Sequence, residues 1–179
     1  MNVFEAIKAR RSIRSFLDKP IKEEILLKLF EAARQAPSAS NRQEWRFVIV
    51  KDIKMRKKLA TATKGQNFIE EAPVIVACCA VTDNHIMTCG QLCYPIDVAI
   101  AIDHISLVAV EMGLGTCWIG AFYEDKVKEI LEIPAYVRVV ELLAIGYPKK
   151  IQDTSKERLP LKEIIFKEKW GNYYLEEKT

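Results

Sequence analysis

One stretch of this sequence is apolar on nearly every side of a helix, and it limits the folds that the chain can adopt. The segment from Val98 to Met112 reads VAIAIDHISLVAVEM and ends before Gly113. A helix of this composition must be buried, either inside a domain or in a subunit interface. The chain has 179 residues, the length of a single domain, so we expect one compact unit.

Composition excludes several classes of protein. Half of the residues are hydrophobic and 28% are charged, unlike a disordered chain. No apolar run reaches the roughly 18 residues that span a bilayer, and the N-terminus lacks a signal peptide's apolar core, so we expect a cytoplasmic protein. A net charge of +3 does not indicate a nucleic-acid or membrane partner. The five cysteines are expected to be free thiols.

Hydrophobic periodicity predicts helices that alternate with four or five strands, and therefore an α+β or α/β layer architecture. Asn2 and Asp52 are the expected N-caps of two of the helices. The predicted helices cover residues 2–10, 22–36, 52–63, 98–112 and 123–130, and the predicted strands cover 45–50, 74–81, 116–119 and 138–145. The segment 161–166 is helical or extended, and an aromatic tail follows it.

Three arginines and a serine lie together where the first helix ends, in the sequence Arg10-Arg11-Ser12-Ile13-Arg14. Guanidinium groups match phosphate oxygens in bidentate fashion, so this cluster is a candidate phosphate site. The alternative is a solvated basic helix end, because cations are favoured at a helix C-terminus.

Two further segments are polar or rich in glycine. The loop Pro37-Ser38-Ala39-Ser40-Asn41-Arg42-Gln43 could contact a polar heterocycle or could only connect two elements. The segment GLGTCWIG (113–120) resembles a dinucleotide fingerprint, but its third glycine comes too late and it follows a helix rather than a strand. A Rossmann site is therefore rejected.

The remaining metal-ligand types do not form a convincing metal site. Asp97, His104 and Glu111 are spaced seven residues apart, about 10 Å along a helix, so we expect a polar seam. Cys78 and Cys79 would point to opposite faces of a strand, while Cys89 and Cys93 would share a helix face. Zinc sites usually have two tight pairs of ligands, so we expect free thiols and no metal.

Taken in order, these segments resemble the nitroreductase family of FMN-dependent NAD(P)H oxidoreductases. The resemblance rests on five kinds of motif at the right separations: ARRSIRSF (9–16), APSASNRQEWRF (36–47), AP (72–73), the stretch 94–120, and the pair GYP (146–148) and KERLPL (156–161). It implies an α+β fold with a central mixed sheet flanked by helices, in an intertwined homodimer with FMN at the interface. It also implies a family domain at 1–165, with the aromatic tail 166–179 packed on the partner subunit.

The resemblance further implies where the cofactor binds. The phosphate and ribityl contacts would come from Arg10, Arg11, Ser12 and Arg14, with Lys156 and Arg158 as distant phosphate ligands. Gly120 would place a backbone N–H near flavin N5, and Asn67 would touch the ring or the ribityl chain. The loop residues expected against the flavin, from the partner subunit, are Pro37, Ser38, Ala39, Asn41 and Gln43.

The implied activity is transfer of reducing equivalents from NADH or NADPH through FMN to a nitroaromatic, a quinone or another flavin, in a ping-pong cycle. No protein nucleophile is needed, because the cofactor carries the chemistry. One alternative is a specialised member of the same family, of the flavin-consuming, reductive dehalogenase or dehydrogenase type. The other is a nucleic-acid-binding module that uses the arginines near residue 10 and the basic helix after Lys51.

Overall fold

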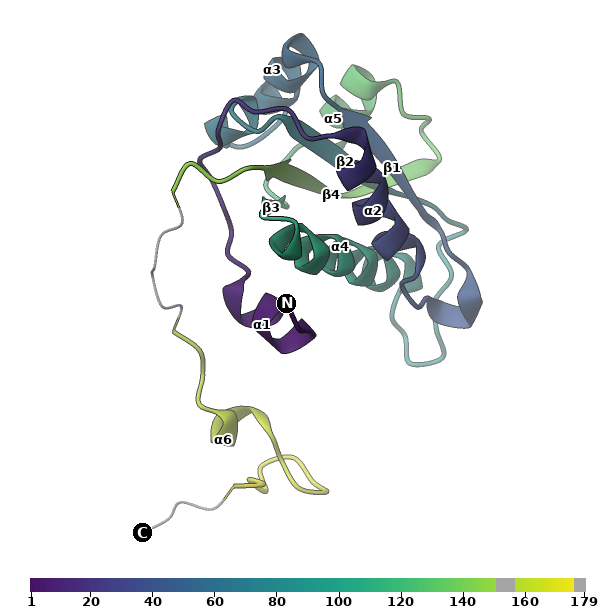
Figure 1. Ribbon diagram of the computed structural model, residues 1–179. Coiled ribbons are helices and arrows are strands. Elements are labelled where there is room, and N and C mark those ends of the chain that lie inside the picture. Colours follow the sequence, from purple (N-terminus) through teal and green to yellow (C-terminus); the bar gives the residue numbers. More distant parts are fainter. Residues whose placement is uncertain (151–156, 176–179) are drawn as a thin grey trace.

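A single antiparallel sheet organises the described part of the chain, which comprises residues 1–150 and 157–175 of the computed structural model. Its strands run in the order β1-β2-β4-β3 (Figure 1). Antiparallel registers join β1 to β2, β2 to β4, and β4 to β3. The strands are β1 (Trp45–Val50), β2 (Val74–Val81), β3 (Gly115–Ile119) and β4 (Val137–Gly146).

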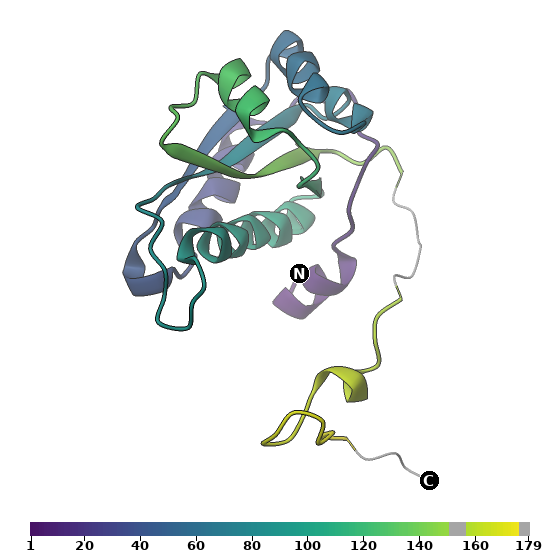
Figure 2. The same cartoon turned by 180° about the vertical axis from the view of Figure 1, so that it is seen from behind.

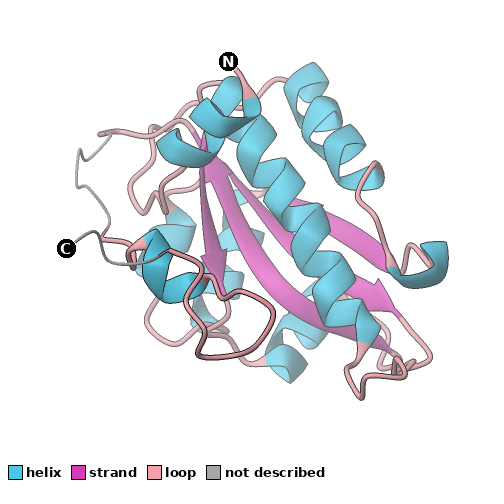
Figure 3. Cartoon of the chain, turned by 90° about the horizontal axis from the view of Figure 1, so that it is seen from below, coloured by secondary structure: helices cyan, strands magenta, loops and turns pink. Residues whose placement is uncertain are grey.

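Helices cover both faces of this sheet (Figures 1 and 3). The core between α2, α4 and the sheet contains Leu29, Ile102 and Leu143, and the core on the α3 and α5 side contains Leu59, Val127 and Leu142. The α+β layer architecture expected from the sequence is therefore confirmed. The helices are α1 (Val3–Ala9), α2 (Glu23–Arg34), α3 (Ile53–Thr61), α4 (Cys93–Glu111), α5 (Glu124–Leu131) and α6 (Leu161–Ile164), with short 3-10 turns at Ala39–Asn41 and Asn67–Glu70.

The apolar helix α4 is longer than the sequence predicts, because it begins at Cys93 rather than at Val98. Pro95 lies in its first turn, where a proline costs no helical hydrogen bond. Its 19 residues are long and apolar enough to cross a membrane. In this fold, however, its side chains at Ala101, Ile102 and Ile105 are fully buried against the sheet and α2. The helix is thus the core element that its composition predicts.

Not every cation of the basic helix α3 and the residue before it is free to face solvent. Arg56 is buried, and its guanidinium donates to the carbonyls of Glu70 and Ala72 at 2.7 and 2.6 Å. Lys51, just before the helix, forms an ion pair with Glu23. Two of the cations in this basic segment are therefore engaged within the protein. The predicted N-caps are confirmed, since Asn2 and Asp52 both accept backbone N–H groups.

The cysteines are free thiols, as predicted. Cys78 and Cys79 lie on opposite faces of β2, each in a different core. The expectation that Cys89 and Cys93 share a helix face is wrong, because Cys89 lies in the exposed turn before α4.

The described C-terminal segment, residues 157–175, lies apart from the sheet and its helices (Figures 1 and 2). Its aromatic side chains pack on one another: the ring of Phe166 is 4.7 Å from that of Trp170 and 5.1 Å from that of Tyr173, centroid to centroid. Trp170 is nevertheless 90% exposed. This apolar cluster has little covering from the described residues of its own chain.

Candidate functional site

The arginine-rich segment after α1 runs beside β3. Ser12 forms a parallel bridge with Thr116, and the N–H of Ile13 donates to the Thr116 carbonyl at 2.9 Å. Ile13 packs directly over Gly115, where an added Cβ would lie only 2.3 Å from Ile13 Cγ1. Because side chains alternate along an extended segment, Ser12 and Arg14 project to the side opposite Ile13. Ser12 is half-buried and Arg14 is exposed.

The two arginines at the end of α1 behave differently. The Arg11 guanidinium donates to the carbonyls of Lys8 and Arg10, and so caps the helix. This is the alternative that the sequence left open for a basic helix end. Arg10 is half-buried, and its backbone N–H closes the helix on Ala6. Its side chain is the better placed of the two to bind an anion.

Gly120 directly follows β3, the strand that carries the Ser12 bridge. Gly120 comes four positions after Thr116, which is about 13 Å along an extended strand. Gly120 is exposed, and Trp118, two residues before it, donates from Nε1 to Ser106 Oγ on α4 at 2.9 Å. One end of β3 therefore lies beside the segment that carries the arginines and Ser12, and at the other end Gly120 exposes its backbone. The strand fixes the distance between these two features.

A second segment meets the far end of β3. The N–H of Lys64 donates to the Ala121 carbonyl at 2.8 Å, and Thr63 bridges Phe122. Asn67, which is exposed, begins the 3-10 turn three residues after Lys64. The structure thus brings the Asn67 segment to the Gly120 end of the strand. The exposed Lys64 was missed in the sequence, where an isolated lysine beside a glycine gives no signal.

The motifs that carry the family resemblance also meet one another. Phe16 bridges Pro148 and is 1% exposed. A Cβ added to Gly146 would lie 2.5 Å from Pro73 Cδ and 2.7 Å from Phe16 Cδ1. Only glycine fits at position 146, where Phe16 and Pro73 pack against the backbone. This close packing holds Phe16 against the end of β4.

The loop between α2 and β1 is held in a strained, well-bonded conformation. Ser40, Asn41 and Gln43 all have left-handed backbone angles, with φ values of 50°, 55° and 51°. Ser38 Oγ accepts the N–H of Gln43 at 3.1 Å, and Gln43 Nε2 donates to the Asn41 carbonyl at 3.2 Å. Pro37 and the side chain of Asn41 remain exposed. The loop is therefore preformed and presents part of its surface outward.

A buried polar network anchors this loop. The backbone N–H of Ala39 donates to the carboxylate of Asp97, while Cys93 Sγ donates to Glu44 at 3.4 Å. Arg42 bridges Glu44 and Asp83. Burial raises the pKa of Cys93 and of Asp97. Glu44, Cys93 and Asp97 could by type and spacing hold a metal ion, but each already has a protein partner.

The two halves of the predicted cofactor site are not brought together within one chain. The loop is bonded to Asp97 near the start of α4, whereas Ile13 packs on Gly115 just after the end of α4. A helix of 19 residues is about 28 Å long. Figures 1 and 2 both show the loop before β1 and the segment after α1 on opposite sides of the molecule.

Of the two predicted C-terminal phosphate ligands, the one that the structure describes, Arg158, is not brought to the arginine cluster either. Arg158 is exposed and donates to the carbonyl of the neighbouring Glu157 at 3.1 Å. Lys156 lies outside the described residues.

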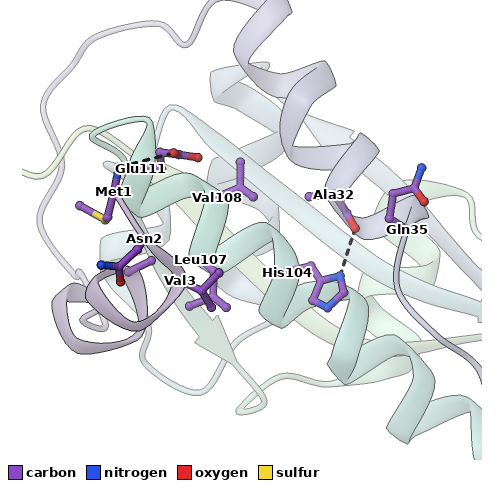
Figure 4. A pocket seen from close by; sticks show the side chains of 10 residues that line it. Met1, Asn2, Val3, Ala32, Gln35, His104, Leu107, Val108 and Glu111 are labelled. Atoms are coloured by element: carbon purple, nitrogen blue, oxygen red, sulfur yellow. Dashed lines mark hydrogen bonds and ion pairs between the residues drawn. The ribbon is translucent and has the colours of Figure 1, made fainter.

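A cavity of about 360 Å³ lies between α1, α2 and α4 and is mostly apolar (Figure 4). His104 Nδ1 is 3.2 Å from the Ala32 carbonyl at one end, and Glu111 pairs with the N-terminal amine of Met1 at the other. With Asp97 bonded to Ala39, each member of the predicted polar seam has its own partner. The expected cofactor residues do not line this cavity.

Comparison with known proteins identifies the family to which this architecture belongs. A family model described as "Nitroreductase family" matches residues 7–87 and 66–147, and so spans the arginine cluster, the loop and the whole sheet. The chain belongs to the nitroreductase family. Among curated nitroreductase relatives, an FMN reductase [NAD(P)H] of Bacillus subtilis is 33% identical over 187 residues, which covers 95% of this chain and 75% of that protein.

Solved nitroreductase structures share the fold. A nitroreductase family protein from Clostridium novyi NT superposes with a TM-score of 0.80 at 35% identity, covering 97% of each chain. An NADPH:FMN oxidoreductase from Vibrio harveyi, solved in complex with NAD⁺, superposes with a TM-score of 0.85 at 28% identity, covering 95% of this chain and 78% of that one. The α+β nitroreductase fold expected from the resemblance is therefore confirmed. The expected mixed sheet is not found among the described strands, since all three pairings between them are antiparallel.

Proposed function

We propose that this nitroreductase is an FMN-dependent oxidoreductase that takes reducing equivalents from NADH or NADPH. The observation that carries the proposal is the bridge between Ser12 and Thr116, which sets the arginine segment alongside a strand that ends at the exposed Gly120. Relatives named as an FMN reductase and an NADPH:FMN oxidoreductase support the same reading.

The residues along β3 fit FMN by their chemistry. The phosphate is an anion and calls for cations and hydroxyl donors, which Arg10, Ser12 and Arg14 supply at one end. The ring calls for an approach to backbone, which the bare Gly120 permits. Arg11 would add charge near the phosphate while it caps α1. Asn67 would lie toward the ring or the ribityl chain.

In this proposal, two chains complete each site. The loop residues Pro37, Ser38, Ala39, Asn41 and Gln43 lie at the opposite end of α4 from Ser12, so they would cover the flavin bound by the partner subunit. An isologous dimer makes both contacts twice, since each chain gives its loop to the other. Lys156 and Arg158 would likewise approach the phosphate of the FMN that the partner subunit binds.

The exposed apolar surface supports a homodimer. On α1, Val3, Phe4 and Ile7 are 70%, 65% and 50% exposed, beside the apolar cavity against α4. Monomers rarely expose so much contiguous apolar surface. We place the interface over α1 and α4, and the tail 166–179, beyond the family domain 1–165, on the partner. The tail's aromatic cluster would gain there the covering that its own chain does not provide.

FMN would supply hydride acceptance and donation when bound. The protein would supply binding, orientation and a surface open enough for the nicotinamide and the acceptor to alternate. A nitroaromatic, a quinone or another flavin would be the acceptor. The family-internal alternative is a flavin-consuming, dehalogenating or dehydrogenating enzyme, which would use the same cofactor site. The buried Arg56 and the paired Lys51 count against a nucleic-acid-binding surface.

We further propose a cytoplasmic location, because the five cysteines are free thiols, as is usual in a reducing compartment.

Ligand titration of the flavin-free protein tests the proposed cofactor. FMN should bind with a stoichiometry of one per chain and far more tightly than riboflavin, which lacks the phosphate. Equal affinity for the two flavins would contradict the phosphate site. Failure to bind either would overturn the proposed function.

A further inference from the structure

A single carboxylate interrupts the apolar strand β4 next to the end of β3. The registers pair Phe47 with Cys78 and Cys78 with Glu141, so these residues form one row across the sheet. Ile119 pairs with Leu142, so the next residue, Gly120, lies across from Glu141. By alternation Glu141 faces the same side as Leu143, which packs in the core beneath α4.

The carboxyl of Glu141 reaches toward Gly120. A Cβ built on Gly120 would lie 3.6 Å from each of its two carboxylate oxygens. Because residue 120 is glycine, no side chain stands between the carboxyl and the space beside the backbone at that position. The geometry therefore places a titratable group at the point where the ring edge of the flavin is proposed to bind.

The surroundings of Glu141 favour its neutral form. Burial raises its pKa from 4.5 to about 7. Among the described residues it has no ion pair or hydrogen-bond partner, and no fully buried oxygen lacks one, so its oxygens keep access to the surface. A neutral acid that reaches the surface can exchange a proton with solvent.

The described groups around Glu141 are neutral or already bonded to other residues, so they do not stabilise its charged form. From β2 it faces the buried thiol of Cys78, and from β1 the row ends in the apolar Phe47. On α4 the buried acid Asp97 is bonded to Ala39, and the ring of Tyr94 lies under the guanidinium of Arg138. Arg138 itself is bonded to Glu124 at 2.9 and 3.0 Å.

We propose that Glu141 is a proton-exchanging group at the ring edge of the bound flavin, taking up a proton when the flavin is reduced. The inference rests on the proposed function. A hydride from the nicotinamide brings two electrons and one proton, and leaves negative charge on the ring. That charge disfavours a neighbouring carboxylate, so Glu141, where it is ionised before reduction at a pH above its pKa, takes one proton from solvent.

The same proton balances the second half-reaction. An acceptor such as a quinone gains a hydride and needs one further proton to become the neutral product. Glu141 releases its proton as the hydride leaves, and returns to its starting state. Electrons and protons therefore balance over the cycle without another co-reactant.

The pH dependence of the flavin reduction potential tests the proposal, with three proteins: the wild type, Glu141→Gln, and the control Glu129→Gln on the exposed face of α5. At about pH 8, above the pKa of Glu141, the wild type and the control should take up two protons for every two electrons. Glu141→Gln should take up only one. Glu141→Asp, which keeps a carboxyl, should restore the second proton.

The outcomes separate this inference from the proposed function. If all variants bind FMN and the Glu141→Gln potential follows the wild-type dependence on pH, the role of Glu141 is overturned and the function stands. If the wild type does not bind FMN, the function is wrong, and the inference falls with it before any potential is measured.

Discussion

The backbone N–H of Ala39 donates to both carboxylate oxygens of Asp97, at 3.1 and 3.2 Å, across a separation of 58 residues. This contact ties the loop between α2 and β1 to the core helix α4. It holds a loop that has three residues with left-handed backbone angles among positions 40–43, so the strain there depends on its anchor.

Replacing Asp97 with alanine should therefore loosen the loop. The loss of a hydrogen bond to a charged group predicts a fall of roughly 1.5–3 kcal/mol in the free energy of unfolding. Affinity for FMN should also fall, because the loop is proposed to cover the partner's cofactor. Asp103→Ala, at an exposed site on the same helix, is the control for denaturant unfolding and flavin titration. Equal stability of the two variants would show that the anchor is unimportant.

Stability of the flavin-free protein should depend on pH through Glu141. Its pKa is about 7 in the folded chain against 4.5 ordinarily, so folding takes up a proton between these two values. The contribution of this group to stability should therefore be highest below about pH 4.5 and decrease as the pH rises to about 7, by at most on the order of 3 kcal/mol. Denaturant unfolding at several pH values should show that Glu141→Gln lacks this decrease. A difference between variant and wild type that stays constant with pH would refute it.

The guanidinium of Arg56 is expected to stabilise the fold rather than bind a ligand. It donates to three carbonyls, those of Lys51, Glu70 and Ala72. Arg56→Ala leaves these acceptors without their donor, so the free energy of unfolding should fall by at least about 2 kcal/mol. Lys57→Ala, on the exposed side of α3, should change it little. If the two variants unfold at the same denaturant concentration, the hydrogen bonds of Arg56 contribute nothing to the free energy of unfolding.

The sequence predicts the sheet well and the longest helix less well. β1 and β2 are short runs of β-branched and aromatic residues, and their predicted bounds match the structure. The start of α4 was missed by five residues, because Cys93, Tyr94 and Pro95 have poor helix propensity and are held in place by tertiary packing.

Local patterns reveal less about the site. The arginine segment stands out in the sequence, but its bridge to Thr116 joins residues more than a hundred positions apart. Glu141 was not singled out, because a lone carboxylate in an apolar strand does not indicate what lies across from it. Its neighbour Gly120 becomes visible only through the register of β3 and β4.

Arg10 and Arg158 are expected to act together on one phosphate, although the described chain does not bring them into contact. Each single change to alanine should weaken FMN binding by about 1.5–3 kcal/mol, one to two decades in affinity. The double variant should be non-additive, because the two residues share a ligand. Riboflavin affinity should be nearly unchanged in all three variants. If it falls as far as FMN affinity, these arginines stabilise the fold or the dimer instead.

Anaerobic addition of NADH or NADPH to the purified protein tests the central claim most directly. The account predicts a yellow protein that carries one FMN per chain and whose flavin absorbance is bleached by the nicotinamide. Its colour should return when a quinone or nitroaromatic is added. A protein that stays colourless after incubation with FMN, or whose bound flavin neither nicotinamide reduces, would contradict it.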